Sequence, residues 1–171
     1  MTGRTPSGRG ALMSVRPARR EDAAAMAALI NPIIAKGGAT AYEEPLGPPY
    51  FAARIDALAP PFSAHVAEAD GRLIGFQFME PHDNLPEDTG DMASFVALDA
   101  GRSGVGRALF AASSAAARAA GLRALQAYVR ADNEVGLAYY EAMGFRTRRI
   151  DAAIPLKDGT PVDRVAKLLV L

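Results

Sequence analysis

Residues 62–80, "FSAHVAEADGRLIGFQFME", constrain the fold more than any other segment of this chain. Two apolar-rich runs flank the dipeptide Asp70-Gly71, which suits the two positive φ angles of a type I′ turn. The pattern predicts an antiparallel hairpin, and it therefore puts a β-sheet near the middle of the chain.

The segments on either side of this hairpin alternate between strand and helix patterns. Further strands are expected at 14–19, 91–98, 122–129, 145–154 and 162–171, the last two joined through the "KDGTP" turn. Helices are expected at 20–33, 49–58, 104–121 and 133–144, the first of them ended by Pro32 and by Gly37-Gly38. This order predicts an α/β sandwich in which a mixed sheet carries helices on both faces.

Composition limits what such a domain does. The 171 residues predict a single domain over 14–171, preceded by a disordered, polar and basic lead at 1–13. The 19 basic and 19 acidic residues cancel, so no nucleic acid or membrane partner is expected. Because the chain has no cysteine and only two histidines, we expect neither disulfides nor a metal centre, and we expect a cytoplasmic protein.

The stretch "AGRSGVGRALF", residues 100–110, leads from a strand into a helix through a glycine-rich turn. Gly104 and Gly106 permit positive φ angles, so successive N–H groups can converge on an anion, and Arg102 and Arg107 can add charged hydrogen bonds. A tight loop with two solvated arginines is the alternative. A P-loop is excluded because no Lys-Ser/Thr pair follows, and a dinucleotide fingerprint because Leu109 replaces its third glycine.

A second motif, "YVRADNEVGLAYYEAMGF", spans residues 128–145. Asp132 or Asn133 can cap the helix that starts there. The spacing predicts an inward stripe of Val135, Ala138, Tyr139, Ala142 and Met143. Tyr140 falls off this stripe, so its hydroxyl is expected to be the freer of the two tyrosines. Such a hydroxyl can act as a general acid, although a half-exposed aromatic packed on Leu137 is the alternative.

Together, "GRSGVGRALF" and "NEVGLAYYEAMGF" resemble the paired signatures of the GNAT superfamily of N-acetyltransferases. Gly101 stands where the family prefers Gln or Arg, and Gly136 where alanine is usual. The resemblance implies a mixed, mostly antiparallel seven-stranded sheet, with acetyl-CoA as the acyl donor. It also implies that Asn133 contacts the pantetheine portion of the donor and that Tyr140 protonates the departing thiolate. The remaining cofactor contacts that it implies are Phe95 and Val96 along the pantetheine arm, and Arg102, Ser103, Gly104, Val105, Gly106 and Arg107 around the pyrophosphate.

A narrower stretch, "NPIIAKGGATAYEEPL" at 31–46, resembles the phosphinothricin and methionine sulfoximine acetyltransferase branch of that family. Asp91 falls at the position of the glutamate that opens a strand in this branch. Tyr42 and Glu44, with His82, are accordingly the expected contacts of the acceptor. The segment "MEPHDNLPEDTG" that follows the hairpin is acidic, which favours a cationic or amino-acid-like amine.

An amine must lose a proton to attack a thioester, so a proton acceptor is expected near the strand ends. Glu80, Asp91 and His82 are the candidates, with ordered water or a mere solvated turn residue as alternatives. The leading hypothesis is an acetyl-CoA-dependent N-acetyltransferase that acts on the primary amine of a small molecule. The alternatives are acetylation of a protein N-terminus or lysine, and a non-catalytic acyl-CoA-binding module. The apolar final strand "VAKLLVL" suits either a homodimer contact or ordinary core.

Overall fold

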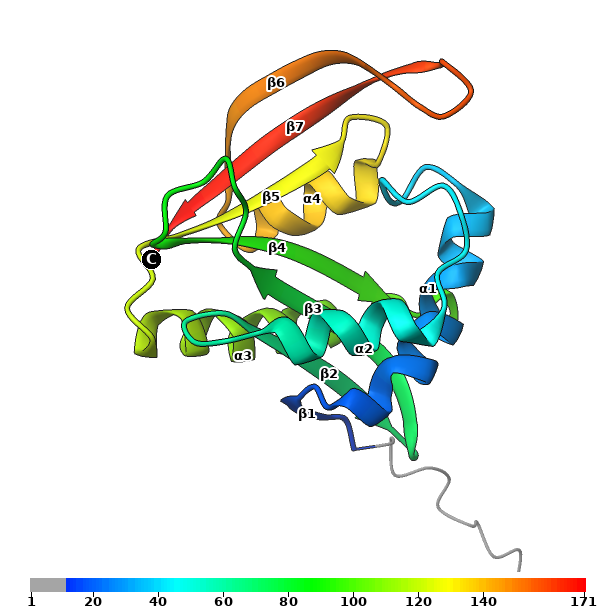
Figure 1. Ribbon diagram of the computed structural model, residues 1–171, viewed down its shortest axis with the longest axis vertical. Coiled ribbons are helices and arrows are strands. Elements are labelled where there is room, and N and C mark those ends of the chain that lie inside the picture. Colours follow the sequence, from blue (N-terminus) through cyan, green and yellow to red (C-terminus); the bar gives the residue numbers. More distant parts are fainter. Residues whose placement is uncertain (1–11) are drawn as a thin grey trace, which may run out of the picture.

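The computed structural model describes residues 12–171 (Figure 1). The predicted lead at 1–13 therefore lies outside the described residues, except for Leu12 and Met13. The strands are β1 (Ser14–Pro17), β2 (Ser63–Ala69), β3 (Arg72–Glu80), β4 (Thr89–Val96), β5 (Ala124–Arg130), β6 (Arg146–Pro155) and β7 (Pro161–Val170). The helices are α1 (Ala23–Lys36), α2 (Pro48–Ala57), α3 (Val105–Ala119) and α4 (Glu134–Ala142), with short 3-10 turns η1 (Arg20–Asp22) and η2 (Leu98–Ala100).

All seven strands form one sheet in the order β1-β2-β3-β4-β5-β7-β6. Every neighbouring pair is antiparallel except β4 and β5, which run parallel because α3 carries the chain back between them. The predicted α/β fold with a mixed, mostly antiparallel sheet is confirmed. Asp70 and Gly71 have φ angles of 51° and 73°, so the β2–β3 hairpin turns as its sequence predicts.

Helices cover both faces of the sheet. On one face, α1 and α2 pack through Met26, Ile30 and Phe51 against Phe76 and Phe78 of β3. On the other face, α3 packs over β1–β4, while α4 lies over β5 and contributes to a core with the end of α3. Side chains alternate between the two faces along residues 75–79 of β3, because successive residues of a strand point to opposite faces. A register shift against β2 interrupts the alternation at Ile74, which packs with α3. Within residues 12–171, no helix combines the length and apolar character that crossing a bilayer requires.

Helix α1 corrects one expectation. Pro32 was expected to end this helix, but α1 continues through it to Lys36 and ends at Gly37, whose φ is 76°. A proline inside a helix removes one backbone hydrogen bond and is costly. Here the apolar residues that follow, Ile33 and Ile34, are both buried, and their packing holds the last turn in helical form.

Candidate active site

Strands β4 and β5 separate halfway along their length (Figure 1). Their register runs only from Thr89 opposite Ala124 to Met92 opposite Ala127, although β4 continues to Val96 and β5 to Arg130. Beyond that point β5 stays paired with β7, so one edge of β4 has no strand partner near Phe95 and Val96. Unpaired backbone groups at a strand edge can pair with an extended ligand. This is the edge along which the resemblance to GNAT enzymes implies the pantetheine arm.

The glycine-rich turn comes directly after β4 and leads into α3. Gly104 precedes the helix with a φ of 81°, and Arg102 also has a positive φ of 61°. No side chain caps the first turn of α3, so its N–H groups remain available, and residues 101–104 are exposed. A helix N-terminus with free amides favours an anion. The turn therefore has the geometry of an anion site, and binding of the pyrophosphate there stays a prediction.

Helix α4 presents a different face to the core from the one predicted. Val135 is 83% exposed, and Ala138 and Ala142 are exposed as well, whereas Tyr140 is only 6% exposed. The prediction that Tyr140 lies off the buried face, and is freer than Tyr139, is wrong. The stripe is rotated by about one residue because Tyr140 packs edge-on against Phe145 at 5.1 Å, which fixes how the helix sits.

The hydroxyl of Tyr140 nevertheless reaches the place where β4 and β5 separate. It lies 2.9 Å from Ser94 Oγ and 3.5 Å from the carbonyl oxygen of Met92. Gln77 Nε2 donates to Ser94 Oγ at 2.6 Å and to the Tyr139 hydroxyl at 3.2 Å. Burial raises the pKa of Tyr140, so the phenol keeps its proton at neutral pH. This buried chain links Tyr140 to the strand edge.

The same network extends to the glycine-rich turn. Tyr139 donates its hydroxyl hydrogen to the carbonyl oxygen of Gly106, 2.8 Å away in the first turn of α3. Sequence reasoning missed Gln77 and Ser94. The sequence signal for Gln77 is that a polar residue interrupts the apolar run "LIGFQFM". In the structure its side chain is fully buried, and its Oε1 atom has no hydrogen-bond partner among the described residues.

Two of the predicted proton acceptors are neighbours on adjacent strands. Glu80 of β3 stands directly opposite Asp91 of β4. Arg54 of α2 forms a close ion pair with Glu80, with its Nε 2.9 Å from Glu80 Oε1. Asp91 accepts only a 3.3 Å bond from Gln126 Nε2, and burial raises its pKa. Of the two carboxylates, Asp91 is the one that remains available to take a proton.

The third candidate, His82, is exposed in the β3–β4 connection, where its Nδ1 accepts the N–H of Asn84 at 3.2 Å. It lines a shallow groove of about 490 Å³ together with Phe62 and Glu87. Over the described part of the chain, no three His, Asp or Glu side chains gather in a group that could hold a metal ion.

The residues predicted to contact the acceptor divide into two places. Tyr42 lies beside Arg54, which donates to its hydroxyl at 3.0 Å, and its hydroxyl is 2.7 Å from that of Tyr50. Glu44 instead forms an exposed ion pair with Lys157 in the β6–β7 turn. Tyr42 therefore joins the Arg54–Glu80 pair, whereas Glu44 ties two surface segments together. No sequence pattern points to Arg54 or Tyr50, because only the packing of α2 brings them to Tyr42.

Asn133 caps α4, as one reading of the sequence allows. Its side-chain oxygen accepts the N–H of Gly136 at 2.9 Å, and its Nδ2 donates to the carbonyl oxygen of Ala39 at 3.1 Å. A Cβ atom at position 136 would lie 2.4 Å from Asn133 Nδ2. Glycine at this position thus permits the capping conformation. Contact between Asn133 and pantetheine stays a prediction.

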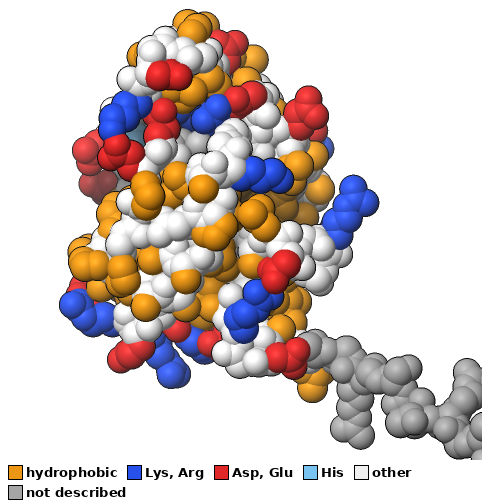
Figure 2. Space-filling view, turned by 90° about the vertical axis from the view of Figure 1, so that its right-hand side faces the viewer, with side chains coloured by type: hydrophobic (Ala, Val, Ile, Leu, Met, Phe, Trp, Pro, Cys, Tyr) orange, Lys and Arg blue, Asp and Glu red, His pale blue; other side chains and the backbone are white. Residues whose placement is uncertain are grey.

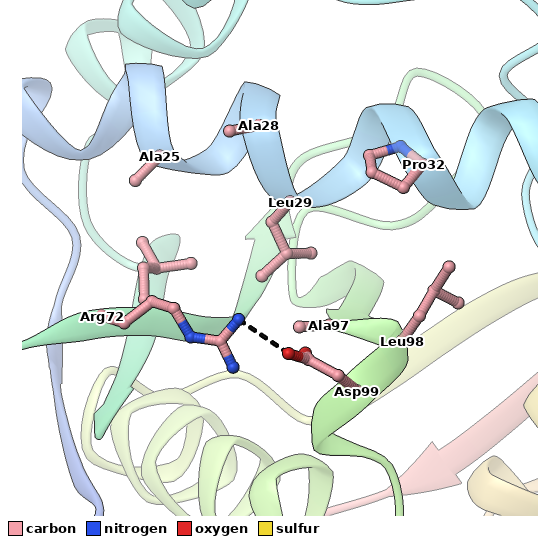
Figure 3. A pocket seen from close by; sticks show the side chains of 9 residues that line it. Ala25, Ala28, Leu29, Pro32, Arg72, Ala97, Leu98 and Asp99 are labelled. Atoms are coloured by element: carbon pink, nitrogen blue, oxygen red, sulfur yellow. Dashed lines mark hydrogen bonds and ion pairs between the residues drawn. The ribbon is translucent and has the colours of Figure 1, made fainter. Parts of the chain in front are cut away.

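The groove drawn in Figure 3 lies away from these residues. It has a volume of about 360 Å³ and runs between α1 and η2. Leu29 and Leu98 line it, and the ion pair of Arg72 with Asp99, 2.9 Å long, closes its base. None of the predicted site residues contributes to it. We therefore do not assign it to the reaction.

Comparisons with known proteins agree with this geometry. The family model described as "Acetyltransferase (GNAT) family" matches residues 34–145. Mycothiol acetyltransferase from Streptomyces avermitilis is 35% identical over 92 residues, which are 53% of this chain and 29% of that protein. This chain thus spans less than a third of that relative.

Solved structures share the fold. The ribosomal-protein-alanine N-acetyltransferase from Brucella melitensis superposes with a TM-score of 0.85 at 22% identity, covering 92% of this chain and 99% of that one. A phosphinothricin acetyltransferase from Sinorhizobium meliloti, in complex with acetyl-CoA, superposes with a TM-score of 0.84 at 21% identity, covering 93% and 88%. The resemblance of both motifs to GNAT enzymes is confirmed, and the chain belongs to the GNAT acetyltransferase family.

Proposed function

We propose that this acetyltransferase transfers the acetyl group of acetyl-CoA to the primary amine of a small molecule. The observation that carries the proposal is the Tyr140 hydroxyl, held by Ser94 at the point where β4 loses its partner β5. The free amides of the glycine-rich turn would hold the pyrophosphate. The residues that form this cradle are Arg102, Ser103, Gly104, Val105, Gly106 and Arg107.

The hydrogen-bond directions suit Tyr140 as the acid. Gln77 already donates to Ser94, so the single hydrogen of Ser94 can point to the oxygen of Tyr140. The phenol hydrogen then remains for the sulfur that leaves when the carbon–sulfur bond of the thioester breaks. A hydrogen bond accepted by the phenol oxygen also makes the phenol a stronger acid, which opposes the effect of burial.

Asp91 would take the proton that the attacking amine gives up. As a carboxylate it first attracts the ammonium form of the acceptor, and its raised pKa makes it a better base than an exposed aspartate. Glu80 is a poorer candidate, because Arg54 holds both of its oxygens in an ion pair. Its pairing instead holds Arg54, which also donates to the Tyr42 hydroxyl and whose charge acts on Asp91.

A small acceptor is favoured over a peptide by the segment between α1 and α2. Arg130 donates to the carbonyl oxygen of Thr40 at 3.5 Å, and the backbone N–H of Lys157 donates to the carboxylate of Glu43 at 3.0 Å. The segment is therefore tied both to β5 and to the β6–β7 turn. Figure 2 views the molecule from this side, where charged side chains of both signs gather in the upper part. A segment held at both places leaves less room for a peptide and suits a compact acceptor.

A homodimer and a cytoplasmic location stay predictions.

The test is release of CoA, measured with a thiol reagent across amino acids, polyamines and short peptides. The protein adds no thiol background, since it has no cysteine. Turnover on a small amine should fall about 10²-fold or more in Tyr140→Phe, the range expected for a lost general acid. Tyr139→Phe, which removes the neighbouring hydroxyl, should cost much less. Binding of acetyl-CoA without turnover on any amine would favour the non-catalytic module.

A further inference from the structure

Two arginines stand directly opposite each other on neighbouring strands. Arg130 of β5 pairs in register with Arg164 of β7, and the two residues are 8% and 7% exposed. Opposed side chains of an antiparallel pair share one face and lie about 5 Å apart at Cβ. Like charges at that spacing repel, and burial strengthens the repulsion. Packing alone does not explain such a pair.

Only one of the two guanidinium groups forms an ion pair. Arg130 forms a forked ion pair with Asp132, with nitrogen–oxygen distances of 2.8 and 2.6 Å. Asp151 of β6 stands opposite Arg164 in the register, but Arg149 and the Tyr128 hydroxyl already hold its carboxylate. Among residues 12–171, the side chain of Arg164 makes no hydrogen bond and no ion pair.

The side chain of Arg164 is largely buried, but its guanidinium group is not fully shielded from solvent. Within the described chain, the buried polar side-chain atoms that lack both partner and solvent contact are Ser63 Oγ and Gln77 Oε1. The nitrogens of Arg164 therefore keep some contact with solvent. A buried cation without a counter-ion is costly, and an entering anion removes that cost. The planar fork of arginine matches a carboxylate with two parallel hydrogen bonds.

The side chain of Arg164 lies on the same face of the sheet as that of Asp91. Gln126, which donates to Asp91, is four residues before Arg130 on β5, so the two side chains point to the same face. Four residues along β5 span roughly 13 Å, and the steps from β4 to β5 and from β5 to β7 add about 4.8 Å each, so the backbones of Asp91 and Arg164 lie roughly 16 Å apart. The long arginine side chain can span part of this distance. One small molecule can thus meet Asp91 with its amine and Arg164 with an anionic group.

We infer that Arg164 binds the carboxylate, or an equivalent anionic group, of the acceptor amine. The acceptor is then an amino-acid-like zwitterion, not a polyamine or another purely cationic amine. This inference rests on the proposed function and names its substrate class. Arg130, with its charge already paired to Asp132, positions the segment at Thr40 over the same face.

The experiment compares amino acids with their carboxamides, which keep the amine and the side chain but lose the negative charge. Wild-type protein should acetylate the acids with a higher kcat/KM. In Arg164→Gln, kcat/KM for the acids should fall about 10- to 100-fold, as for a lost charge-assisted hydrogen bond. The kcat/KM for the carboxamides and the KM for acetyl-CoA should change little. Arg148→Gln, which removes an exposed arginine from β6, is the matched control.

Equal use of acids and carboxamides by the wild type, or an equal loss for both in Arg164→Gln, would overturn the inference. So would a higher KM for acetyl-CoA, because Arg164 would then belong to the phosphate site of the donor. If no amine is acetylated, the proposed function fails, and binding decides the inference separately. N-acetyl amino acids, but not their carboxamides, should then raise the Tm of the wild type and leave Arg164→Gln unchanged.

A stability measurement separates a ligand site from a structural arginine. Arg164→Met removes a buried charge that forms no ion pair while keeping much of the volume, so its Tm should rise above that of the wild type. A structural role predicts the opposite, a lower Tm. Should Arg164→Gln fail to fold, Arg164→Met serves in its place, and Arg164→Lys should recover part of the preference for acids.

Discussion

Replacing Ser94 with alanine should slow acetyl transfer, and it should do so only through its effect on Tyr140. The Ser94 hydroxyl lies between Gln77 Nε2, at 2.6 Å, and the Tyr140 hydroxyl, at 2.9 Å. Without it, the phenol keeps only the Met92 carbonyl oxygen, which at 3.5 Å is at the outer limit of a hydrogen bond. The phenol then loses both the group that orients it and the hydrogen bond that increases its acidity.

The size of the effect follows from the single bond that is lost. A hydrogen bond between neutral groups contributes about 0.5–1.5 kcal/mol, so kcat should fall roughly 2- to 12-fold in Ser94→Ala. Loss of the whole acid in Tyr140→Phe should cost about 10²-fold or more. Gln77 keeps the Tyr139 hydroxyl at 3.2 Å, so the fold should lose about 1 kcal/mol, or about 2–4 °C in Tm.

A double-mutant cycle measures whether Ser94 acts through Tyr140. We would determine kcat by CoA release for the wild type, both single variants and the double variant, with thermal melts in parallel. Once the phenol hydroxyl is gone, Ser94→Ala should have no further effect on kcat. Ser94→Thr keeps the hydroxyl and should recover most of the activity. If the two losses multiply in the double variant, Ser94 has a role independent of Tyr140 and the reasoning is refuted.

Two further predictions concern Asp91 and the cap of α4. Asp91 must be ionised to accept a proton, and burial raises its pKa, so kcat/KM should fall as the pH is lowered through that raised value. This acidic limb should disappear in Asp91→Asn and persist in Glu80→Gln; the reverse pattern would identify Glu80 as the base. Gly136→Ala should not raise the Tm, because the new Cβ displaces Asn133 and the lost cap offsets the gain of about 1 kcal/mol in helix propensity. Thermal unfolding checks this, and an increase of 2–4 °C would contradict it.

Local patterns predicted what depends on local structure. The β2–β3 turn needs only Asp70 and Gly71, and the conformation before α3 needs only Gly104, so both could be read from a few residues. The inward face of α4 could not. Its sequence has apolar side chains on more than one face, and the contact with Phe145, which lies outside the helix, decides which tyrosine is buried.

The acid network depends on register, which no single segment contains. Gln77 is visible as a polar residue in an apolar strand, but its partner Ser94 is known only once β3 and β4 are aligned. The same alignment sets Glu80 opposite Asp91. Only the packing of α2 then brings Arg54 into an ion pair with Glu80 and not with Asp91. Sequence reasoning could name both carboxylates, but it could not rank them.

Strand β7 itself contains the comparison that distinguishes a structural cation from one that awaits a ligand. Lys167 is 2% exposed, more deeply buried than Arg164, and it faces the opposite side of the sheet. Its ammonium is satisfied by Glu141 at 2.8 Å and by the hydroxyl of Thr147 at 3.3 Å. The fold thus supplies partners to a buried cation on this strand where the cation serves packing alone. Three residues earlier it supplies none to Arg164, on the face that carries the candidate base, so the missing partner is best sought in the acceptor.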